Sequence, residues 1–176
     1  YTTLFRSSNW LNEHRLVLNY QKTNVMIIAS RHQLNNIQNF EVEVNGHVLK
    51  DVDKIKCLGV VIDRELKWTD HVDKIVGTVQ ATLGMLRRVK PYLPLTSLKL
   101  LFNAFILPHF DYCSQIWSER LSLHTDKLYK LQKHAARLIL NKGYDTPSTE
   151  LFEELNWLPL SKRFLYLRAV FLYKLC

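Results

Sequence analysis

Three closely spaced pairs of carboxylates are the first residues in this sequence that could do chemistry. Polymerases, phosphatases and nucleases need two or more carboxylates close enough to share metal ions. Each pair also has an ordinary explanation, because the first flanks an expected turn and the last stands at an expected helix start. The sequence therefore predicts no metal site from these pairs. They are Asp51 with Asp53, Asp63 with Glu65, and Asp70 with Asp73.

Histidine and cysteine residues are scattered along the chain. None of the seven histidines forms an H-x3-H pair or a His/Cys quartet with zinc spacing, and a lone helical histidine is usually a surface or boundary residue. The three cysteines, Cys57, Cys113 and Cys176, argue against a disulfide framework and favour a reducing, intracellular compartment, the nucleus or the cytoplasm. We expect Cys57 and Cys113 to be small core residues.

Basic residues on expected helices are the feature best suited to binding. Lys130, Lys133 and Arg137 recur at i, i+3 and i+7, so they share one helix face, and Lys127 lies at its border. Such a stripe can follow a phosphate backbone, although a solvated face is the commoner explanation of an isolated stripe. An earlier helix is expected to carry three more basic residues in its last turn, namely Arg87, Arg88 and Lys90.

The net charge of +8 supports an anionic partner, nucleic acid first and an acidic membrane surface second. Residues 1–68 carry nine Lys/Arg and seven Asp/Glu, whereas residues 69–176 carry fifteen and nine, so the excess lies in the second part. No stretch of about 18 apolar residues occurs, so we expect no membrane span. Nucleic acid is the partner that the charge favours.

Strands are expected in residues 1–68 and helices in residues 69–176, which makes the fold class α+β. Alternating apolar residues around Asn45-Gly46 predict a hairpin over 40–50, because a type I′ turn needs positive φ at both central residues. The other expected elements of the first part are a short helix at 9–17, a strand at 24–29, a polar loop at 30–36 and a strand at 55–63 in which Gly59 marks a bulge or a close backbone approach.

Helical spacing of apolar residues replaces alternation from residue 69 onward. Thr69 is expected to cap the first helix and Pro91 to end it, while Pro108 must kink or split the second. The five helices are expected near 69–90, 97–117, 122–141, 147–156 and 161–176.

Five blocks of this sequence, in order, resemble reverse transcriptases of non-long-terminal-repeat retrotransposons, the LINE-like and jockey-like elements. Each block alone is weak, but together they cover nearly the whole chain. The resemblance implies the C-terminal part of a polymerase palm at 1–68, with motif-D-like and primer-grip-like strands, followed by an all-helical thumb bundle at 69–176. The blocks are "WLNEHRLVLNYQKTNVMII", "VDKIKCLGVVIDRELKWTDHV", "LLFNAFILPHFDYCSQIW", "LYKLQKHAARLIL" and "LFEELNWLPLSKR".

The resemblance also implies roles for individual residues. Lys22 would be the lysine of the palm's fourth motif, proposed to protonate the departing pyrophosphate, whereas a lysine that snorkels from a strand edge is the ordinary alternative. Leu58 and Gly59 would contact nucleic acid in the primer-grip region. The family's aspartates hold Mg²⁺ just before a run that Thr2-Thr3-Leu4-Phe5 matches, and Tyr1 stands where the last aspartate is expected. Mg²⁺ would thus belong to the intact enzyme and not to this chain.

Two functions follow from the sequence. The first is a fragment of an RNA-directed DNA polymerase that binds a template–primer duplex, an RNA–DNA hybrid, and is active only with the upstream palm and fingers of the same longer chain. The alternative is a decayed or domesticated helical module that binds RNA or a protein partner without catalysis.

Overall fold

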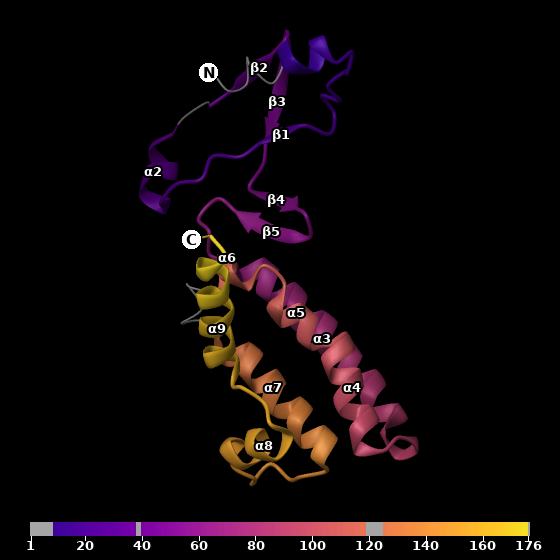
Figure 1. Cartoon of the computed structure of the whole chain (residues 1–176). Helices are drawn as coiled ribbons and strands as arrows, with labels where there is room; N and C mark the ends of the chain where they lie inside the picture. Colours follow the sequence, from indigo (N-terminus) through magenta and orange to yellow (C-terminus); the bar gives the residue numbers. More distant parts are fainter. Residues whose placement is uncertain (1–8, 38–39, 119–124, 176) are drawn as a thin grey trace. The chain divides into compact units, whose positions relative to one another are not determined.

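The computed structural model describes residues 9–37, 40–118 and 125–175 (Figure 1). The chain forms two compact units, Tyr1–Lys67 and Trp68–Cys176. Small sheets in the first unit and helices in the second give an α+β fold class, as predicted. Tyr1 and the run Thr2-Thr3-Leu4-Phe5, next to which the resemblance places the metal-binding aspartates, lie outside the described residues.

A three-stranded sheet with the order β1-β3-β2 organises the first unit. β1 (Asn24–Val25) pairs in parallel with β3 (His47–Asp51), and β2 (Val42–Val44) pairs antiparallel with β3. Asn45 and Gly46 form the turn with φ of 52° and 80°, as a type I′ turn requires. The predicted hairpin is therefore confirmed.

The strand expected at 24–29 is shorter than predicted, since only Asn24–Val25 pairs with a neighbouring strand. Val25 accepts a backbone hydrogen bond from Val52 at 3.0 Å, and the Ala29 N–H then donates to the Arg64 carbonyl at 3.1 Å. The chain thus leaves the first sheet after β1 and reaches the segment that follows the second hairpin.

A second hairpin replaces the single strand expected at 55–63. β4 (Lys54–Cys57) pairs antiparallel with β5 (Val60–Asp63), and the turn between them holds Leu58 at φ 46° and Gly59 at φ 92°. Gly59 therefore supplies a turn rather than a bulge, because positive φ is easy for glycine. Because leucine rarely adopts such a φ, Leu58 carries no turn signal in the sequence.

The polar segment 30–36, expected to be a loop, is also different. Residues Arg31–Asn36 form α2, and Ser30 caps it in a capping box with Gln33. The Ser-x-x-Gln spacing is the sequence signal for this cap. The expected helix at 9–17 is shorter than predicted, since residues 9–13 are helical and residues 14–15 form a turn.

Buried apolar residues are few in the first unit. Among its described residues, Val44, Leu49 and Val60 are buried. Val17 is 91% exposed and Val48 is 62% exposed. The described part of the unit therefore presents apolar surface that a further layer could cover.

Two cysteines lie outside the core that was expected to hold them. Cys57 is exposed at the end of β4, and Cys113 is half-buried. The core prediction was wrong for Cys57 because this residue directly precedes the exposed turn of the hairpin. Cys176 is not among the described residues.

The longest helix, α3 (Thr69–Val89), opens the second unit. Its N-cap is Trp68 at φ 64°, so Thr69 is the first helical residue rather than the cap. The helix continues as a short 3-10 turn, η1 (Lys90–Tyr92), whose second residue is Pro91. The buried residues of α3 follow the expected helical spacing, except that His71 is buried as well and Val76 is only half-buried; they are His71, Val72, Ile75, Val79, Leu83 and Leu86.

Pro108 splits the second helical segment, as predicted. α4 (Leu95–Phe105) ends before it and α5 (Leu107–Asp111) includes it in the first turn. Cys113, at φ 51°, then reverses the chain into α6 (Ser114–Trp117).

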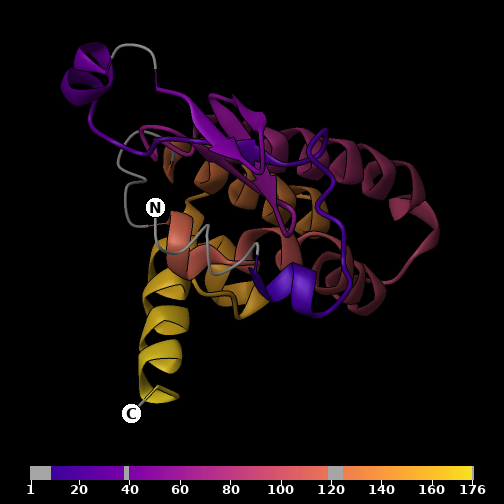
Figure 2. The same ribbon diagram turned by 90° about the horizontal axis from the view of Figure 1, so that it is seen from above.

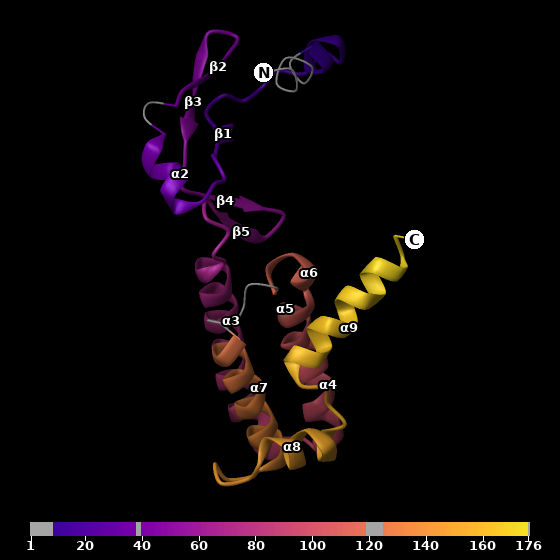
Figure 3. The same cartoon turned by 90° about the vertical axis from the view of Figure 1, so that its left-hand side faces the viewer.

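α7 (Thr125–Leu140) packs side by side with α3 (Figure 3). The two helices run parallel, because contacts join their corresponding ends. Lys127 donates to Asp73 at 2.6 Å near the N-terminal ends, and Lys90 donates to Asn141 at 2.6 Å near the C-terminal ends. These two contacts therefore join α3 to α7, although the contacting residues are about 50 positions apart in the sequence.

α8 (Ser148–Leu155) and α9 (Leu160–Tyr173) complete the second unit. Leu151, Phe152, Leu160 and Phe164 are buried, so both helices contribute to the core. The C-terminal end of α9 extends away from the other helices of its unit (Figure 2), and Tyr173 there is 84% exposed. No helix among the described residues is both long and apolar enough to cross a membrane.

Candidate nucleic-acid interface

Lys22 stands in a tight turn directly before β1. The Asn19 side-chain oxygen accepts the Lys22 N–H at 3.2 Å, and the Thr23 hydroxyl donates to the Asn19 carbonyl at 2.9 Å. These contacts fix the backbone, while the Lys22 side chain is exposed. The ammonium is therefore free to reach a phosphate, and its catalytic role stays a prediction.

Leu58 and Gly59 form the tip of the β4–β5 hairpin. The Leu58 side chain is 86% exposed, and its backbone has a φ of 46°, which is unfavourable for leucine. An exposed leucine in such a conformation contributes little to packing and costs about 1–3 kcal/mol of strain. This tip suits contact with another molecule, and its contact with nucleic acid stays a prediction.

The first acidic pair is bound by a single arginine. Arg64 Nη2 contacts Asp51 Oδ2 at 2.5 Å, and Arg64 Nε lies 3.1 Å from Asp53 Oδ1. The same guanidinium donates to the Val52 carbonyl at 3.3 Å. The pair therefore anchors the link between β3 and β4 to β5.

The other acidic residues are also used in the structure. The Asp63 carboxylate accepts the backbone N–H groups of Glu65 at 3.1 Å and Lys67 at 3.0 Å, which holds the turn before α3. Asp73 binds Lys127 at 2.6 Å. Within the described residues, no group of three or more His, Cys, Asp or Glu side chains could hold a metal ion.

The predicted stripe on α7 divides into bound and unbound cations. Lys127 pairs with Asp73, and the Lys133 ammonium lies 4.6 Å from the centre of the Tyr129 ring. Arg137 turns inward and donates through Nη2 to the carbonyls of the loop after α7, at 3.2 Å each. Lys130 is exposed. The sequence spacing was right, but it did not show which cations are already engaged.

The ends of α3 and α7 enclose a basic pocket with a volume of about 460 Å³. Arg87 and Lys90 come from the end of α3, and Arg137 comes from α7. The pocket thus unites three of the predicted nucleic-acid-binding residues, whereas Arg88 is exposed and does not line it. The remaining lining residues are His134, Leu138, Asn141, Lys142, Gly143 and Tyr144.

The electrostatics of this pocket are strongly positive. Among the described residues, no carboxylate forms an ion pair with Arg87, Lys90 or Arg137. Burial lowers the pKa of His134 from its usual value, and the charges of Arg87 and Arg137 lower it further. Burial first, and the two nearby cations second, therefore disfavour the charged form of His134.

Besides Leu138 and Gly143, sequence reasoning missed the four other lining residues, which have polar or aromatic side chains, namely His134, Asn141, Lys142 and Tyr144. Asn141 had a usable signal, because asparagine often adopts the left-handed conformation that ends a helix. Its φ is 59°, and the Lys142 N–H donates to the Arg137 carbonyl at 3.1 Å, which closes the end of α7. The other three depend on how α7 packs against α3, which the sequence does not show.

His71 corrects the expectation that a lone helical histidine lies at the surface. Its side chain is 4% exposed, and its ring meets Trp117 edge-on with the ring centres 5.5 Å apart. Burial, and then the charge of Lys74, lowers the pKa of His71. Its role is packing at the start of α3.

Motif residues of the helical unit mostly join helices to one another. Gln132, 2% exposed, donates from Nε2 to the Leu158 carbonyl at 2.8 Å and accepts the Leu160 N–H at 3.0 Å. The Trp157 ring stacks on Phe102 with 3.9 Å between ring centres. α7, α4 and the loop before α9 are held together in this way.

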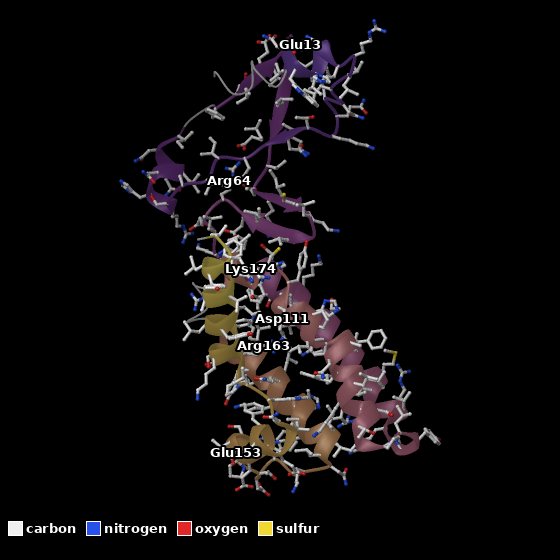
Figure 4. The ribbon with its side chains drawn as sticks, viewed as in Figure 1. Glu13, Arg64, Asp111, Glu153, Arg163 and Lys174 are labelled. Atoms are coloured by element: carbon white, nitrogen blue, oxygen red, sulfur yellow. The ribbon has the colours of Figure 1, made fainter. Side chains whose placement is uncertain are left out.

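Arg163 is the clearest example of a structural motif residue. Its Nε and Nη2 donate to the two carboxylate oxygens of Asp111 at 2.6 Å each, which links α9 to α5 (Figure 4). This hydrogen bonding raises the pKa of Arg163, so the guanidinium stays charged. A two-pronged pair of this kind fixes orientation as well as distance.

Comparison with known proteins relates this chain to a transposon polymerase. Over 156 residues, which are 86% of this chain, the sequence is 25% identical to the probable RNA-directed DNA polymerase from transposon X-element of Drosophila melanogaster. The chain is similar to a transposon reverse transcriptase. It spans 17% of that protein's length. No family model matches the chain, and no solved structure matches it.

The similarity to the X-element polymerase confirms the expected reverse-transcriptase relationship at this coarse level. It extends over both compact units, because 86% of the chain exceeds the length of either one. The jockey-like assignment, the palm and thumb and the individual site residues stay predictions.

Proposed function

We propose that this chain is the nucleic-acid-binding C-terminal part of a reverse transcriptase from a non-long-terminal-repeat retrotransposon. The first unit is the end of the palm, and the helical unit is a thumb that grips a template–primer duplex through its phosphates. The observation that carries the proposal is the similarity to a transposon RNA-directed DNA polymerase over 86% of the chain.

The surface of the helical unit supports this proposal. Lys130 and Arg88 are exposed, and no described carboxylate pairs with either of them. Cations of this kind bind phosphates independently of base sequence, because the duplex backbone carries a dense negative charge. The fixed, parallel packing of α3 and α7 holds such cations at constant spacing.

The first unit supports a place within a larger enzyme. Its exposed apolar side chains, such as Val17 and Val48, suit burial against further palm and fingers layers of the same polymerase. Lys22 would act at the departing pyrophosphate, and Leu58 with Gly59 would contact the primer. Mg²⁺ would be held by aspartates of the intact enzyme, which would work in the nucleus or the cytoplasm.

The test is equilibrium binding of a labelled RNA–DNA hybrid to the 176-residue chain at several salt concentrations. We expect the logarithm of the binding constant to fall steeply with the logarithm of salt, because each neutralised phosphate releases counterions. A slope near zero would remove the phosphate grip. Nucleotide incorporation should require addition of the upstream palm and fingers as a separate polypeptide.

A charge-reversed pair tests the helical face. Lys130→Glu with Lys133→Glu should weaken hybrid binding and reduce the steepness of the salt slope by roughly 2, about 1 for each lost phosphate contact. The matched control is Lys162→Glu with Lys174→Glu, which makes the same change in net charge at two exposed positions, one in α9 and one directly after it. Equal weakening by both pairs would reduce the effect to net charge and refute a specific face.

A further inference from the structure

The basic pocket between the C-terminal ends of α3 and α7 has features beyond a general phosphate-binding surface. It is hollow, with a volume of about 460 Å³, and it is lined by Arg87, Lys90, His134, Arg137 and Lys142. Sites for small ligands have volumes of about 300–1,000 Å³. The pocket is therefore large enough to take a ligand rather than only to touch a passing backbone.

The pocket cations exceed what the helix ends require. Lysine and arginine near a helix C-terminus commonly offset its partial negative charge, roughly half an elementary charge for each helix. Here two helix ends and Glu154, which lies 3.4 Å from Lys142, face four cations. A net charge of about +2 remains within the pocket after these are offset.

Several of the pocket groups are already held in place. Arg137 Nη2 is fixed by the carbonyls of Tyr144 and Thr146 at 3.2 Å each, and Lys90 Nζ is fixed by Asn141 Oδ1 at 2.6 Å. Groups that are ordered before binding lose less entropy when a ligand arrives. All three acceptors are neutral, so these hydrogen bonds leave the positive charges of Arg137 and Lys90 in place.

The chemistry of the lining favours a phosphate group attached to a nucleoside. The exposed Arg87 guanidinium offers the planar donor pair that matches phosphate oxygens, and Arg137, whose Nη2 is engaged by two carbonyls, adds a fixed positive charge. Tyr144 is 82% exposed, and its ring centre lies 5.4 Å from the Arg137 guanidinium carbon. An exposed aromatic ring beside a phosphate site provides a surface on which a base can stack.

We propose that this pocket binds one phosphate group of a nucleic-acid strand, with Arg87, Lys90 and Arg137 as its ligands and Tyr144 beside the attached nucleoside. This inference rests on the proposed nucleic-acid function and specifies where the helical unit holds a single phosphate. The phosphate is either the monoester at a 5′ end or a diester within the strand.

The experiment uses the full chain and measures the binding of short labelled RNA–DNA hybrids that carry either a 5′-phosphate or a 5′-hydroxyl. The variant is Arg87→Gln with Lys90→Gln, and the control is Lys162→Gln in α9 with Lys174→Gln directly after it. Loss of two charged hydrogen-bond donors should weaken binding by about tenfold or more. Stronger binding of the 5′-phosphorylated hybrid would identify the end monoester, and equal binding would identify an internal diester.

A second readout reports on the pocket itself. Sulfate, whose charge is constant across the range used, is added to the chain while the His134 ring is followed by NMR between pH 5 and 8. A bound anion should raise the pKa of His134, because it offsets the charges of Arg87 and Arg137. The Arg87→Gln, Lys90→Gln variant should lose this response to sulfate.

The outcomes separate the two proposals. Salt-dependent hybrid binding that is unchanged in the Arg87→Gln, Lys90→Gln variant, with no response of His134 to sulfate, overturns the pocket and leaves the phosphate grip standing. A response of His134 to sulfate without any hybrid binding overturns the duplex grip and the assignment of the pocket to a nucleic-acid phosphate, and leaves a site for small anions alone. Absence of both overturns both proposals.

Discussion

Replacing Gln132 by leucine should destabilise the helical unit through the start of α9. The Gln132 side chain is 2% exposed and its Oε1 accepts the buried N–H of Leu160 at 3.0 Å. Leu160 is the first residue of α9, so its N–H has no partner within the helix. Leucine has nearly the volume of glutamine and leaves little cavity, so loss of the hydrogen bond dominates the effect.

The magnitude follows from the burial of that donor. A buried N–H left without an acceptor costs about 1–3 kcal/mol. The Leu158 carbonyl, which also loses its partner, belongs to a residue that is 48% exposed, so water can replace the amide there. We therefore expect a loss of about 1–3 kcal/mol in the free energy of unfolding, and each kcal/mol should lower the melting temperature by roughly 4–8 °C.

Urea denaturation of Gln132→Leu and of Gln80→Leu, an exposed position on α3, measures this cost against a matched substitution. Gln132→Glu adds a second test. The ionised form of the introduced side chain would place a carboxylate oxygen against the Leu158 carbonyl, where two acceptors repel each other, whereas a protonated carboxyl group can donate a hydrogen bond to that carbonyl. Measured against the unchanged chain at each pH, that variant should lose less stability near pH 5 than near pH 8. A midpoint for Gln132→Leu equal to that of Gln80→Leu, or a loss of stability in Gln132→Glu that does not change with pH, would refute the assigned role of this side chain.

Three further predictions concern pH, strain and an ion pair. Burial lowers the pKa of His71 and of His134 in the folded chain, so the chain takes up protons when it unfolds below pH 6.5. The stability that these two groups contribute should therefore be complete above pH 6.5 and be lost as the pH falls toward their pKa values in the folded chain. Urea midpoints across that range measure this loss, and a flat profile would contradict it. Leu58→Asn should raise the free energy of unfolding by about 1 kcal/mol, because asparagine tolerates positive φ. The same change should weaken hybrid binding if the exposed leucine contacts the hybrid. An unchanged free energy of unfolding would argue against strain at this position. Asp111→Ala should cost about 1.5–3 kcal/mol by leaving Arg163 without its carboxylate, and the further change Arg163→Met should recover part of that loss; no recovery would place the effect elsewhere.

Local signals in the sequence predicted local structure well. Asn45-Gly46 predicted a hairpin because both residues accept positive φ, and Pro108 predicted the break between α4 and α5 because proline disrupts a continuing helix. The turn at Leu58 was not predictable in this way, because a leucine at φ 46° is held in that conformation by the strands on either side and not by its own preference. The Ser-x-x-Gln spacing of Ser30 and Gln33 is the sequence signal that indicates the start of α2.

The candidate site was predictable only as a set of charges. Helical spacing placed Lys130, Lys133 and Arg137 on one face, but it could not show that Arg137 turns inward to the loop after α7. The meeting of Arg87 with His134 depends on how two helices pack across about 50 intervening residues. Side-chain partners at that distance are set by tertiary packing, which periodicity does not encode.

The contacts between helices in the second unit affect what can be concluded from a match to this sequence pattern. Three of the residues that carry the resemblance use their polar or aromatic groups to contact neighbouring segments of the helical unit, namely Gln132, Trp157 and Arg163. Selection for a foldable chain would preserve them even in a copy that had lost polymerisation. A genome search with these blocks would therefore count molecules able to assume this architecture, and a census of working elements would need a separate criterion drawn from the metal-binding residues.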